Sequence, residues 1–376
     1  MDNPRLTKIE AGYLNGSRPR SHGCNARLPA HGRHVREPVA RLFFEDGSSG
    51  FGYSRVTPEQ AESLHGTHLD SLISLEHGVL PSARSIEFPL WDVLGQRAGK
   101  PVYRLLAGKS DTVESFSVAC YDTSLYFDDL HLADDQAAVD LIASEAREGY
   151  DRGHRAFKLK IGRGALHMSL MEGTRRDIAI IRGVQAAVGS GIPLLVDANN
   201  GYNVNLVKWV LAETAGCNIH WLEEPFHEDR VLYEHLHGWL SEQGLPVLIA
   251  DGEGQPSPHL MDWAREGVID VVQYDLPAYG FSAWLKIGRQ LDTWAVKSAP
   301  HNYGCAMTGY AACHLAGVLK HFAYAEWDHI DLDGLDTTGY AIREGRIHVP
   351  DAPGFGLRLD ETLFRKSVES GGFVVS

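Results

Sequence analysis

The chain has 376 residues, a hydrophobic fraction of 44%, a charged fraction of 22% and a formal net charge of −14 at pH 7, which indicates a folded globular protein and argues against disorder and nucleic-acid binding. No apolar run approaches the roughly 18–20 residues that a membrane span needs, and the five scattered cysteines form no CxxC pair, which argues against a disulfide framework or a zinc knuckle. We therefore expect a cytoplasmic enzyme that binds neither nucleic acid nor membrane.

The first part of the chain predicts a small α+β domain over residues 1–112. Residues 39–53 alternate apolar and polar side chains around a Gly- and Ser-rich turn, which is the pattern of a β-hairpin. Residues 15–37 precede this hairpin, are rich in Gly, Arg and His, and are expected to form a long functional loop. Residues 58–107 show helical patterns that end at Gly99 and Pro101.

From about residue 114 onward, short apolar runs alternate with helical segments. Strands are predicted at residues 115–123, 156–162, 193–199, 219–225, 246–253, 268–276, 294–302 and 322–328. Helical patterns lie between them, for example at residues 137–147, 169–188, 204–215, 230–242, 258–266, 282–290 and 307–319. Eight strands that alternate with helices predict an α/β fold with a TIM-type (β/α) barrel over residues 113–330. The tail, residues 331–376, has hairpin and turn character and is expected to pack back on the N-terminal domain.

Polar side chains recur at the carboxyl ends of these predicted strands. In strand order they are Lys158 and Lys160, Asp197 and Asn199, Glu223 and Glu224, Asp251 and Glu253, Asp275, His301, and Glu326. Successive positions are separated by about one βα unit, so a closed barrel would bring them to one rim, where the active sites of such barrels lie.

The two lysines share a strand face because they are two residues apart. Two neighbouring ammonium groups repel each other, so each should lose its proton more easily, and one of them is a plausible base near neutral pH. Asp275 and His301 come from adjacent strands and, if hydrogen-bonded, would form a general-base dyad in which the carboxylate fixes the imidazole tautomer.

Asp197, Glu223 and Glu253 come from three consecutive strands. Three carboxylates without Cys or His suit Mg²⁺, which prefers oxygen ligands. Asp251 has the same strand parity as Glu253, and either could be the third ligand, although we favour Glu253.

These groups together indicate removal of a proton next to a carboxylate. Such a proton is very weakly acidic, and a divalent cation on the carboxylate would stabilise the enediolate that forms. Reprotonation from the opposite face would give racemisation or epimerisation, whereas loss of a β-hydroxyl, with protonated His301 as acid, would give dehydration.

The chain resembles the enolase superfamily, specifically its mandelate racemase subgroup, over nearly its whole length. The matching segments are LWDVLGQRAGKPVYRLLAG at 90–108, KLK at 158–160, DAN at 197–199, WLEEP at 221–225, ADGE at 250–253, the Asp275 and His301 pair, AEWD at 325–328 and EGRIHVPDAPGFGL at 344–357. This resemblance implies that the N-terminal domain is a capping domain over the barrel.

The resemblance also implies roles for individual residues. Mg²⁺ would bind Asp197, Glu223 and Glu253, and Lys160 and His301 would be the two bases. Glu326 would contact the substrate carboxylate as a hydrogen-bond donor or electrostatic partner, while Asn199 and Tyr121 would line the pocket. Segment 15–37 would set specificity, and its basic residues, which include Arg18, Arg20 and His22, suggest a poly-oxygenated acid or a diacid. Its histidines, including His31 and His34, fit no standard metal motif and are expected in a substrate lid.

Three functions remain open at this point. The first is a Mg²⁺-dependent lyase that dehydrates an aldonate or aldarate, a small-molecule carboxylate, to a 2-keto-3-deoxy acid. The second is a racemase, epimerase or lactone cycloisomerase with the same two-base site. The third is a barrel without catalytic activity that acts as a binding module. The resemblance further implies a homo-oligomer.

Overall fold

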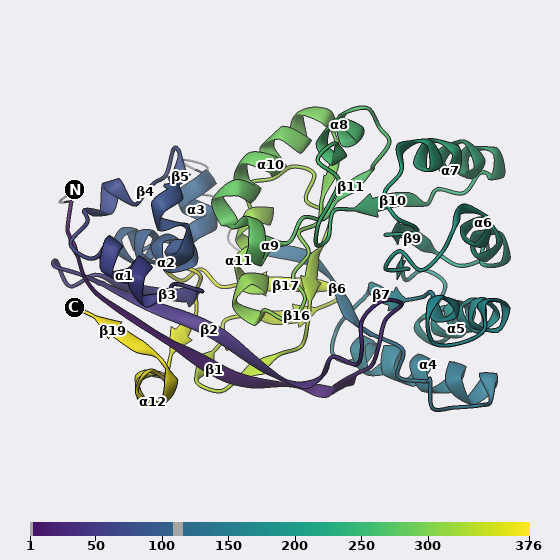
Figure 1. Ribbon diagram of the computed structural model, residues 1–376, viewed down its shortest axis with the longest axis horizontal. Helices are drawn as coiled ribbons and strands as arrows, with labels where there is room; N and C mark the ends of the chain where they lie inside the picture. The colour runs from purple at the N-terminus through teal and green to yellow at the C-terminus, as the bar shows by residue number, and fades with distance from the viewer. Residues whose placement is uncertain (1–2, 108–115) are drawn as a thin grey trace.

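The computed structural model describes residues 3–107 and 116–376, and the predicted boundary at residues 112–113 lies outside these ranges. Eight parallel strands form a closed barrel surrounded by helices (Figure 1). They are β6 (Phe116–Leu125), β7 (Phe157–Lys160), β8 (Leu194–Asp197), β9 (Ile219–Glu223), β10 (Leu248–Asp251), β11 (Val271–Val272), β12 (Lys297–Ser298) and β13 (Ala325–Trp327). A bridge between Ser298 and Phe322, together with the pairing of β13 with β6, closes the barrel. The predicted (β/α) barrel is confirmed.

Helices follow the strands as the alternating pattern predicts. They are α4 (Asp135–Asp151), α5 (Leu170–Val188), α6 (Val204–Glu213), α7 (Arg230–Gln243), α8 (Leu260–Arg265), α9 (Leu276–Tyr279), α10 (Phe281–Trp294) and α11 (Ala306–Ala316). Several begin at side chains that accept hydrogen bonds from the first turn, such as Asp134 for α4, Asn203 for α6 and Asp229 for α7, which satisfies amide groups that would otherwise lack partners. Within the described ranges, no helix is long and apolar enough to cross a membrane.

The N-terminal region is a small antiparallel sheet covered by helices. Its strands are β1 (Leu6–His22), β2 (Gly32–Phe44) and β3 (Ser49–Tyr53), followed by α1 (Pro58–Leu64), the short elements η1 (Leu69–Ser71), β4 (Ile73–Ser74), β5 (Gly78–Val79) and η2 (Pro81–Ile86), and then α2 (Glu87–Ala98) and α3 (Val102–Ala107). The loop expected over residues 15–37 is shorter than predicted and spans residues 23–31, because β1 and β2 stay paired to Ser17↔His34 and rejoin at His22↔Gly32. This long ribbon runs from the N-terminal region to the barrel near β7 (Figure 1).

The tail connects both parts of the molecule. It contains β14 (Asp331–Leu332), β15 (Leu335–Asp336), β16 (Ala341–Arg343), β17 (Arg346–Val349), β18 (Arg358–Leu359), α12 (Glu361–Gly371) and β19 (Phe373–Val375). β14 and β19 pair with β1, so this part packs back on the N-terminal sheet, whereas β17 pairs antiparallel with β6 and extends the barrel sheet. The sequence patterns missed α12.

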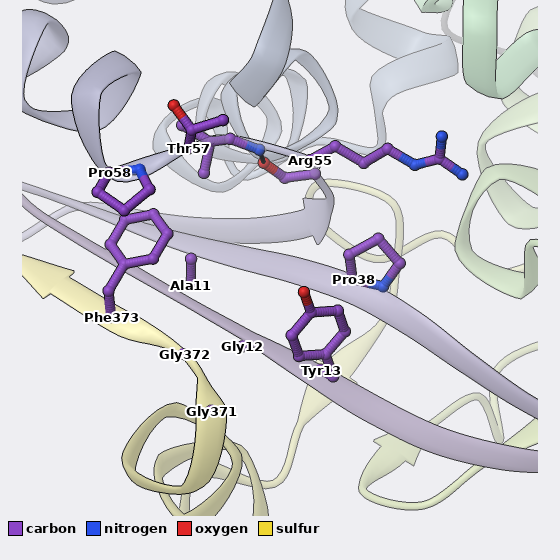
Figure 2. A pocket seen from close by; sticks show the side chains of 12 residues that line it. Ala11, Gly12, Tyr13, Pro38, Arg55, Thr57, Pro58, Gly371, Gly372 and Phe373 are labelled. Atoms are coloured by element: carbon purple, nitrogen blue, oxygen red, sulfur yellow. Dashed lines mark hydrogen bonds between the residues drawn. The ribbon is translucent and has the colours of Figure 1, made fainter.

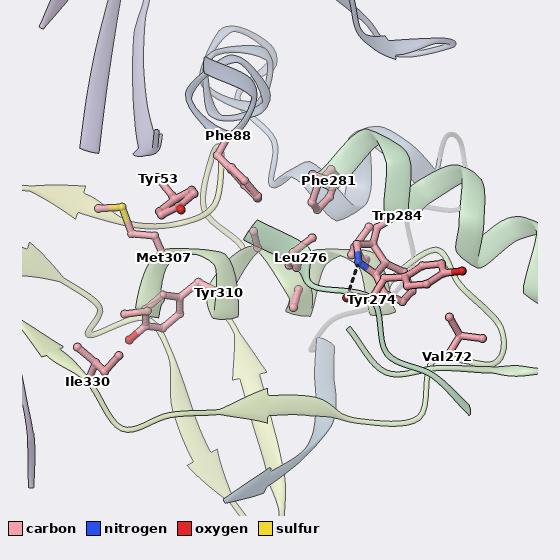
Figure 3. Close-up of a cluster of buried hydrophobic side chains, with 14 of the residues drawn as sticks. Tyr53, Phe88, Val272, Tyr274, Leu276, Phe281, Trp284, Met307, Tyr310 and Ile330 are labelled. Atoms are coloured by element: carbon pink, nitrogen blue, oxygen red, sulfur yellow. Dashed lines mark hydrogen bonds between the residues drawn. The ribbon is translucent and has the colours of Figure 1, made fainter. Parts of the chain in front are cut away.

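An apolar cluster joins the N-terminal region to the barrel helices (Figure 3). Tyr53 and Phe88 lie in this cluster with Phe281 and Met307, all of them buried. At its edge, the backbone N–H of Ser282 donates a 2.6 Å hydrogen bond to the buried carboxylate of Glu87. This packing fixes the N-terminal region on the barrel and places the β1–β2 ribbon over its rim.

A separate cavity of about 450 Å³ lies in the N-terminal region, between β1, residues 54–58 and β19 (Figure 2). Its polar side chains include Tyr13, Arg55 and Thr57, and none of the polar groups at the strand ends lines it. The chemistry predicted from the sequence therefore lies elsewhere.

Candidate active site

Three carboxylates meet at the carboxyl ends of β8, β9 and β10. Asp197 ends β8, Glu223 ends β9, and Glu253 follows β10. Each offers an oxygen, and these oxygens all lie within 4.8 Å of one another. The in-register pairing of Asp197 with Glu223 places the first two side by side. The structure thus brings together the three residues proposed to hold the cation.

The surroundings of these carboxylates fit a divalent cation. Glu253 Oε2 is buried and has no hydrogen-bond partner. Burial and the nearby charge of Asp197 raise the pKa of Glu223, although Trp221 Nε1 and Gln273 Nε2 donate hydrogen bonds to Glu223 Oε2 at 3.1 and 2.9 Å. A crowded, all-oxygen donor set of this kind matches the preference of Mg²⁺.

The two lysines of β7 point into the barrel and pair with these carboxylates. Lys158 Nζ lies 2.8 Å from Glu223 Oε1 and 2.9 Å from Glu326 Oε1, and Lys160 Nζ donates to Asp197 Oδ2. Burial lowers the pKa of each lysine, but the facing carboxylates outweigh it and the net pKa is raised. The prediction of lowered lysine pKa values is therefore wrong for the protein without a bound cation, because charges from other strands exceed the repulsion between the two ammonium groups.

His301 and Asp275 form the predicted pair. His301 Nδ1 hydrogen-bonds Asp275 Oδ1, and the two residues also form a parallel backbone bridge. His301 Nε2 faces the carboxylates, 3.4 Å from Glu253 Oε2 and 3.7 Å from Glu326 Oε2. Burial lowers the pKa of His301, but Glu253, Glu326 and the hydrogen bond to Asp275 raise it to about 10. His301 is therefore held protonated and directed at the same space as Lys160.

Glu326 is an ionised acceptor rather than a donor. Thr123 Oγ1 donates to its Oε1 at 2.7 Å and the backbone N–H of Asn302 donates to its Oε2 at 2.7 Å. Burial would raise the pKa of Glu326, but Lys158 and His301 lower it well below its ordinary value. Of the two alternatives for Glu326, this favours the electrostatic partner.

Asp251 is not part of the cluster formed by Asp197, Glu223 and Glu253. Its side chain accepts from the Tyr233 hydroxyl on α7 and, at 2.7 Å, from the backbone N–H of Gly252. Gly252 has a φ of 129°, which ends the alternation of the strand, so Asp251 and Glu253 no longer share a face. This geometry favours Glu253 as the third metal ligand.

Asn199 and Tyr121 occupy positions less open than expected. The Asn199 amide donates to Glu224 Oε2 at 3.0 Å, while its Oδ1 is buried without a partner. Tyr121 is fully buried in the barrel, two residues before Thr123 on the same face of β6, and its ring packs edge-on against Trp221. Its hydroxyl is buried without a hydrogen-bond partner, and Lys158 Nζ lies 5.6 Å from its ring centroid, so its place in the pocket lining stays a prediction.

The two predicted arginine ligands are already engaged. Arg18 makes a bidentate contact with Asp328, with distances of 2.7 to 3.1 Å, and its Nη1 donates to Gly32 O at 3.4 Å. Arg20 donates to Ser124 and lies 3.5 Å from Glu145. Each therefore already has an acidic partner far away in the sequence, and a role for either in substrate binding stays a prediction.

The histidines of the ribbon lie against two tyrosines that the sequence analysis missed. His22 stacks on Tyr126 and its Nδ1 lies 2.9 Å from the Tyr303 hydroxyl. His31 contacts both rings edge-on, at 4.9 and 5.1 Å between centroids, and its Nε2 is buried without a partner. Burial, and to a smaller extent the positive charge of Lys160, lowers the pKa of His31 to about 4. Tyr303 could have been found from its position two residues after His301.

Comparison with known proteins gives the same family as the sequence motifs. Residues 141–363 match the family described as enolase C-terminal domain-like. The crystal structure of galacturonate dehydratase from Geobacillus sp., complexed with D-galacturonate and 5-keto-4-deoxy-D-galacturonate, is 46% identical with a TM-score of 0.95, and the match covers 100% of both chains. A variant of galacturonate dehydratase from Geobacillus sp., complexed with Mg, is 47% identical with a TM-score of 0.96, covering 99% of this chain and 97% of the other. The D-galactarolactone cycloisomerase of Agrobacterium fabrum is 26% identical over 326 residues, which are 81% of this chain and 78% of the relative.

Proposed function

The chain belongs to the enolase C-terminal domain-like family, and from this premise we propose that its substrate is a hexuronate, D-galacturonate in the first instance. The chain is a Mg²⁺-dependent sugar acid dehydratase. The observation that carries the proposal is the placement of Lys160 and His301 beside one cluster of three carboxylates.

The reaction is an elimination of water. A base removes the proton on C5, next to the carboxylate, and the C4 hydroxyl leaves with a proton as water. The resulting enol then becomes a ketone at C5, which gives the 5-keto-4-deoxy acid. Counted from the carboxylate, this product is a 2-keto-3-deoxy acid, as the sequence analysis expects for a dehydratase.

The side chains divide this work. Lys160 is proposed to take the C5 proton, and His301, which its carboxylate partners hold protonated, is proposed to give a proton to the leaving hydroxyl. Lys158, fixed between Glu223 and Glu326, presents a positive charge toward the substrate carboxylate. When bound by Asp197, Glu223 and Glu253, Mg²⁺ supplies positive charge that stabilises the negative charge developing on the substrate.

The ribbon argues for an acid with a single carboxylate. Arg18 and Arg20 would be the natural partners of a second carboxylate, but both are paired with acidic groups. The space beside Lys160 is instead bordered by His31 and Tyr126, with Lys160 Nζ 5.4 Å from the Tyr126 ring centroid. Neutral imidazole and phenol groups suit the hydroxyls of a monoacid sugar, so we expect a uronate rather than an aldarate.

The test is a comparison of substrates with Mg²⁺ present. D-galacturonate, galactarate, galactonate and D-glucuronate are incubated with the protein, and keto acid formation is followed in time. We expect the highest kcat/KM with a hexuronate. A higher value with galactarate would refute the single-carboxylate argument, and no keto acid from any of the four would refute dehydration of these acids.

Proton NMR in heavy water separates the two reaction types. Deuterium incorporation next to the carboxylate without keto acid would favour an isomerase. The variant Lys160→Met should lose activity, whereas Lys208→Met is the matched control because Lys208 lies on α6, where its Nζ contacts the exposed His235. Equal activity of both variants would exclude Lys160 as the base.

Cytoplasmic location and homo-oligomeric state stay predictions. The five cysteines are all free thiols in the structure, which supports a reducing compartment. Cell fractionation and analytical ultracentrifugation test the two predictions.

A further inference from the structure

A second group of metal-ligating side chains lies on the outer side of the barrel. Asp122 is on β6, on the opposite strand face from Thr123, His154 lies between α4 and β7, and His329 follows β13 by two residues. Each offers one ligand atom, and these atoms all lie within 4.8 Å of one another. Asp122 and His154 are fully buried and His329 is partly buried. Three separate segments thus direct metal-binding atoms to one point.

The carboxylate of this group has an oxygen without a partner. Asp122 Oδ1 accepts a 2.9 Å hydrogen bond from the backbone N–H of Ser124, but Oδ2 is buried with no hydrogen-bond partner. A Cβ at Gly149 on α4 would overlap Oδ2, so the helix approaches this oxygen closely only because residue 149 is glycine. A buried, unpaired carboxylate oxygen is costly unless a cation or proton compensates it.

The two imidazoles do not supply that compensation. His154 Nε2 and His329 Nε2 lie 2.7 Å apart and share a single hydrogen bond. Burial lowers the pKa of both rings, that of His154 to about 4. The group therefore combines one carboxylate with two imidazoles, which are ligand types that a transition-metal ion binds.

We propose that Asp122, His154 and His329 bind a divalent transition-metal ion, Zn²⁺ in the first instance, at a structural site separate from the active site. Two imidazole nitrogens and one carboxylate oxygen suit Zn²⁺ and Co²⁺ better than Mg²⁺. Two nitrogens on one tetrahedral ion lie about 3.3 Å apart, so the two rings separate by about 0.6 Å from their 2.7 Å contact when the ion binds. Cys120 Sγ lies 3.7 Å from His154 Nδ1 and donates to Gly345 O at 3.6 Å.

The ion would have a route to the site and a definite structural effect. His329 lines a cavity of about 430 Å³, together with Arg18, Trp327 and Tyr310. Trp327 pairs with Asp122 across β13 and β6, and Asp328, between Trp327 and His329, holds Arg18 of the ribbon. A metal bond to His329 would therefore fix the segment that anchors the ribbon near the active site.

Cobalt titration tests the proposal. Untagged full-length protein is treated with chelator, given saturating Mg²⁺ to occupy the three-carboxylate site, and titrated with Co²⁺ while the visible absorption is recorded. We expect one equivalent of Co²⁺ to bind and to give the intense bands of low-coordinate, imidazole-bound cobalt. Cobalt in the all-oxygen octahedral site would absorb only weakly, so the two sites can be distinguished. Zn²⁺ should abolish these bands by competition.

Variants assign the site. His329→Gln and Asp122→Asn should each weaken Co²⁺ binding by at least about 100-fold, since loss even of an outer hydrogen-bond partner costs 10- to 100-fold. The control is His77→Gln, because the side chain of His77 is 74% exposed and the residue is distant in sequence from the proposed ligands. This variant should bind Co²⁺ like the unaltered protein. Absence of the intense bands in the unaltered protein, or their persistence in both variants, would overturn the proposal.

X-ray absorption of the unaltered protein with Zn²⁺ gives a test that needs no variant to fold. Two imidazole ligands at about 2.0–2.1 Å are expected. An all-oxygen shell would show that the ion occupies the active-site carboxylates, and the site would then be rejected. Neither result depends on which sugar acid the enzyme uses.

Discussion

Replacing Asp275 by asparagine should impair catalysis without unfolding the protein. Asp275 Oδ1 accepts from His301 Nδ1, and Oδ2 accepts a 3.0 Å hydrogen bond from the backbone N–H of Gly254. An asparagine has one acceptor and one NH₂ group, so it must oppose one of these two N–H donors. If its NH₂ group faces His301, Nδ1 must accept instead of donate, so the imidazole is neutral and keeps its single proton on Nε2.

The size of the effect follows from the interaction lost. A hydrogen bond to a charged group contributes about 1.5–3 kcal/mol, and each 1.36 kcal/mol is a factor of ten in rate. We therefore expect kcat to fall about 10- to 150-fold in Asp275→Asn. KM and the Mg²⁺ concentration for half-maximal activity should change little, because Asp275 is a positioning residue outside the three-carboxylate cluster. Initial rates of keto acid formation at varied substrate and Mg²⁺ give all three quantities.

The chain offers a matched control for this substitution. Asp270 Oδ2 accepts a 2.8 Å hydrogen bond from Ile249 N and lies 3.5 Å from His237 Nε2, so it is another Asp–His pair, placed before β11 at the opposite end of the barrel from His301. Asp270→Asn should keep full kcat. A loss in Asp275→Asn below threefold, or an equal loss in both variants, would refute a special role of the Asp275–His301 hydrogen bond.

Four further predictions address pH, metal, pocket and packing. Burial raises the pKa of Glu37 to about 7 despite hydrogen bonds from the N–H groups of Ala306 and Met307, so the folded state binds more protons than the unfolded state between about pH 4.5 and 7. The free energy of unfolding of the unaltered protein should therefore fall by about 3 kcal/mol relative to that of Glu37→Gln as the pH rises through this range. Urea denaturation of both proteins at pH 5 and pH 8 measures this, and an equal difference between them at the two pH values would contradict it. Chelation should abolish activity, and Mg²⁺ at about 100 times its Kd should restore it and stabilise the protein by roughly 2.7 kcal/mol, measured as a rise in Tm; an unchanged Tm would count against the site. His31→Ala should raise KM about fivefold, the value of one neutral hydrogen bond, with kcat unchanged, and an unaltered KM would remove His31 from the pocket. Gly95→Ala should lower stability by about 1–3 kcal/mol in urea denaturation, because a Cβ there would overlap the backbone of Gly354, and wild-type stability would show that this contact adjusts freely.

The barrel and its polar rim could be predicted because both depend on local patterns. Each strand is a short apolar run, and each polar group, such as Asp197 or Glu223, directly follows one. Once eight such units close into a ring, the side chains at the strand ends must converge. No knowledge of long-range contacts was needed for this step.

The ribbon could not be predicted in the same way. Its distal part is polar on both faces, because it extends beyond the N-terminal core toward the barrel, where Arg18 finds Asp328 at a sequence separation of 310 residues. Ser17 pairs with His34 through backbone groups only, and backbone pairing leaves no pattern in the side chains. Gly, Arg and His in this segment therefore indicated a loop over residues 15–37, where the structure has the ends of two strands and a shorter loop at residues 23–31.

The lysine pKa values show how charge in the site depends on all strands together. The carboxylates around the site are Asp197, Glu223, Glu253, Asp275 and Glu326, and the cationic groups are Lys158, Lys160 and protonated His301. The acidic side chains outnumber the basic ones, so a divalent cation would add positive charge where the site lacks it. Without the cation, the lysines are the main counter-charge, and their pKa values are raised. We expect a cation bound to these carboxylates to weaken their attraction for the Lys160 proton, so that the repulsion from Lys158 would bring the pKa of Lys160 down toward the range of a useful base. Loss of Mg²⁺ should therefore impair the enzyme twice, through weaker binding of the substrate carboxylate and through a base that keeps its proton.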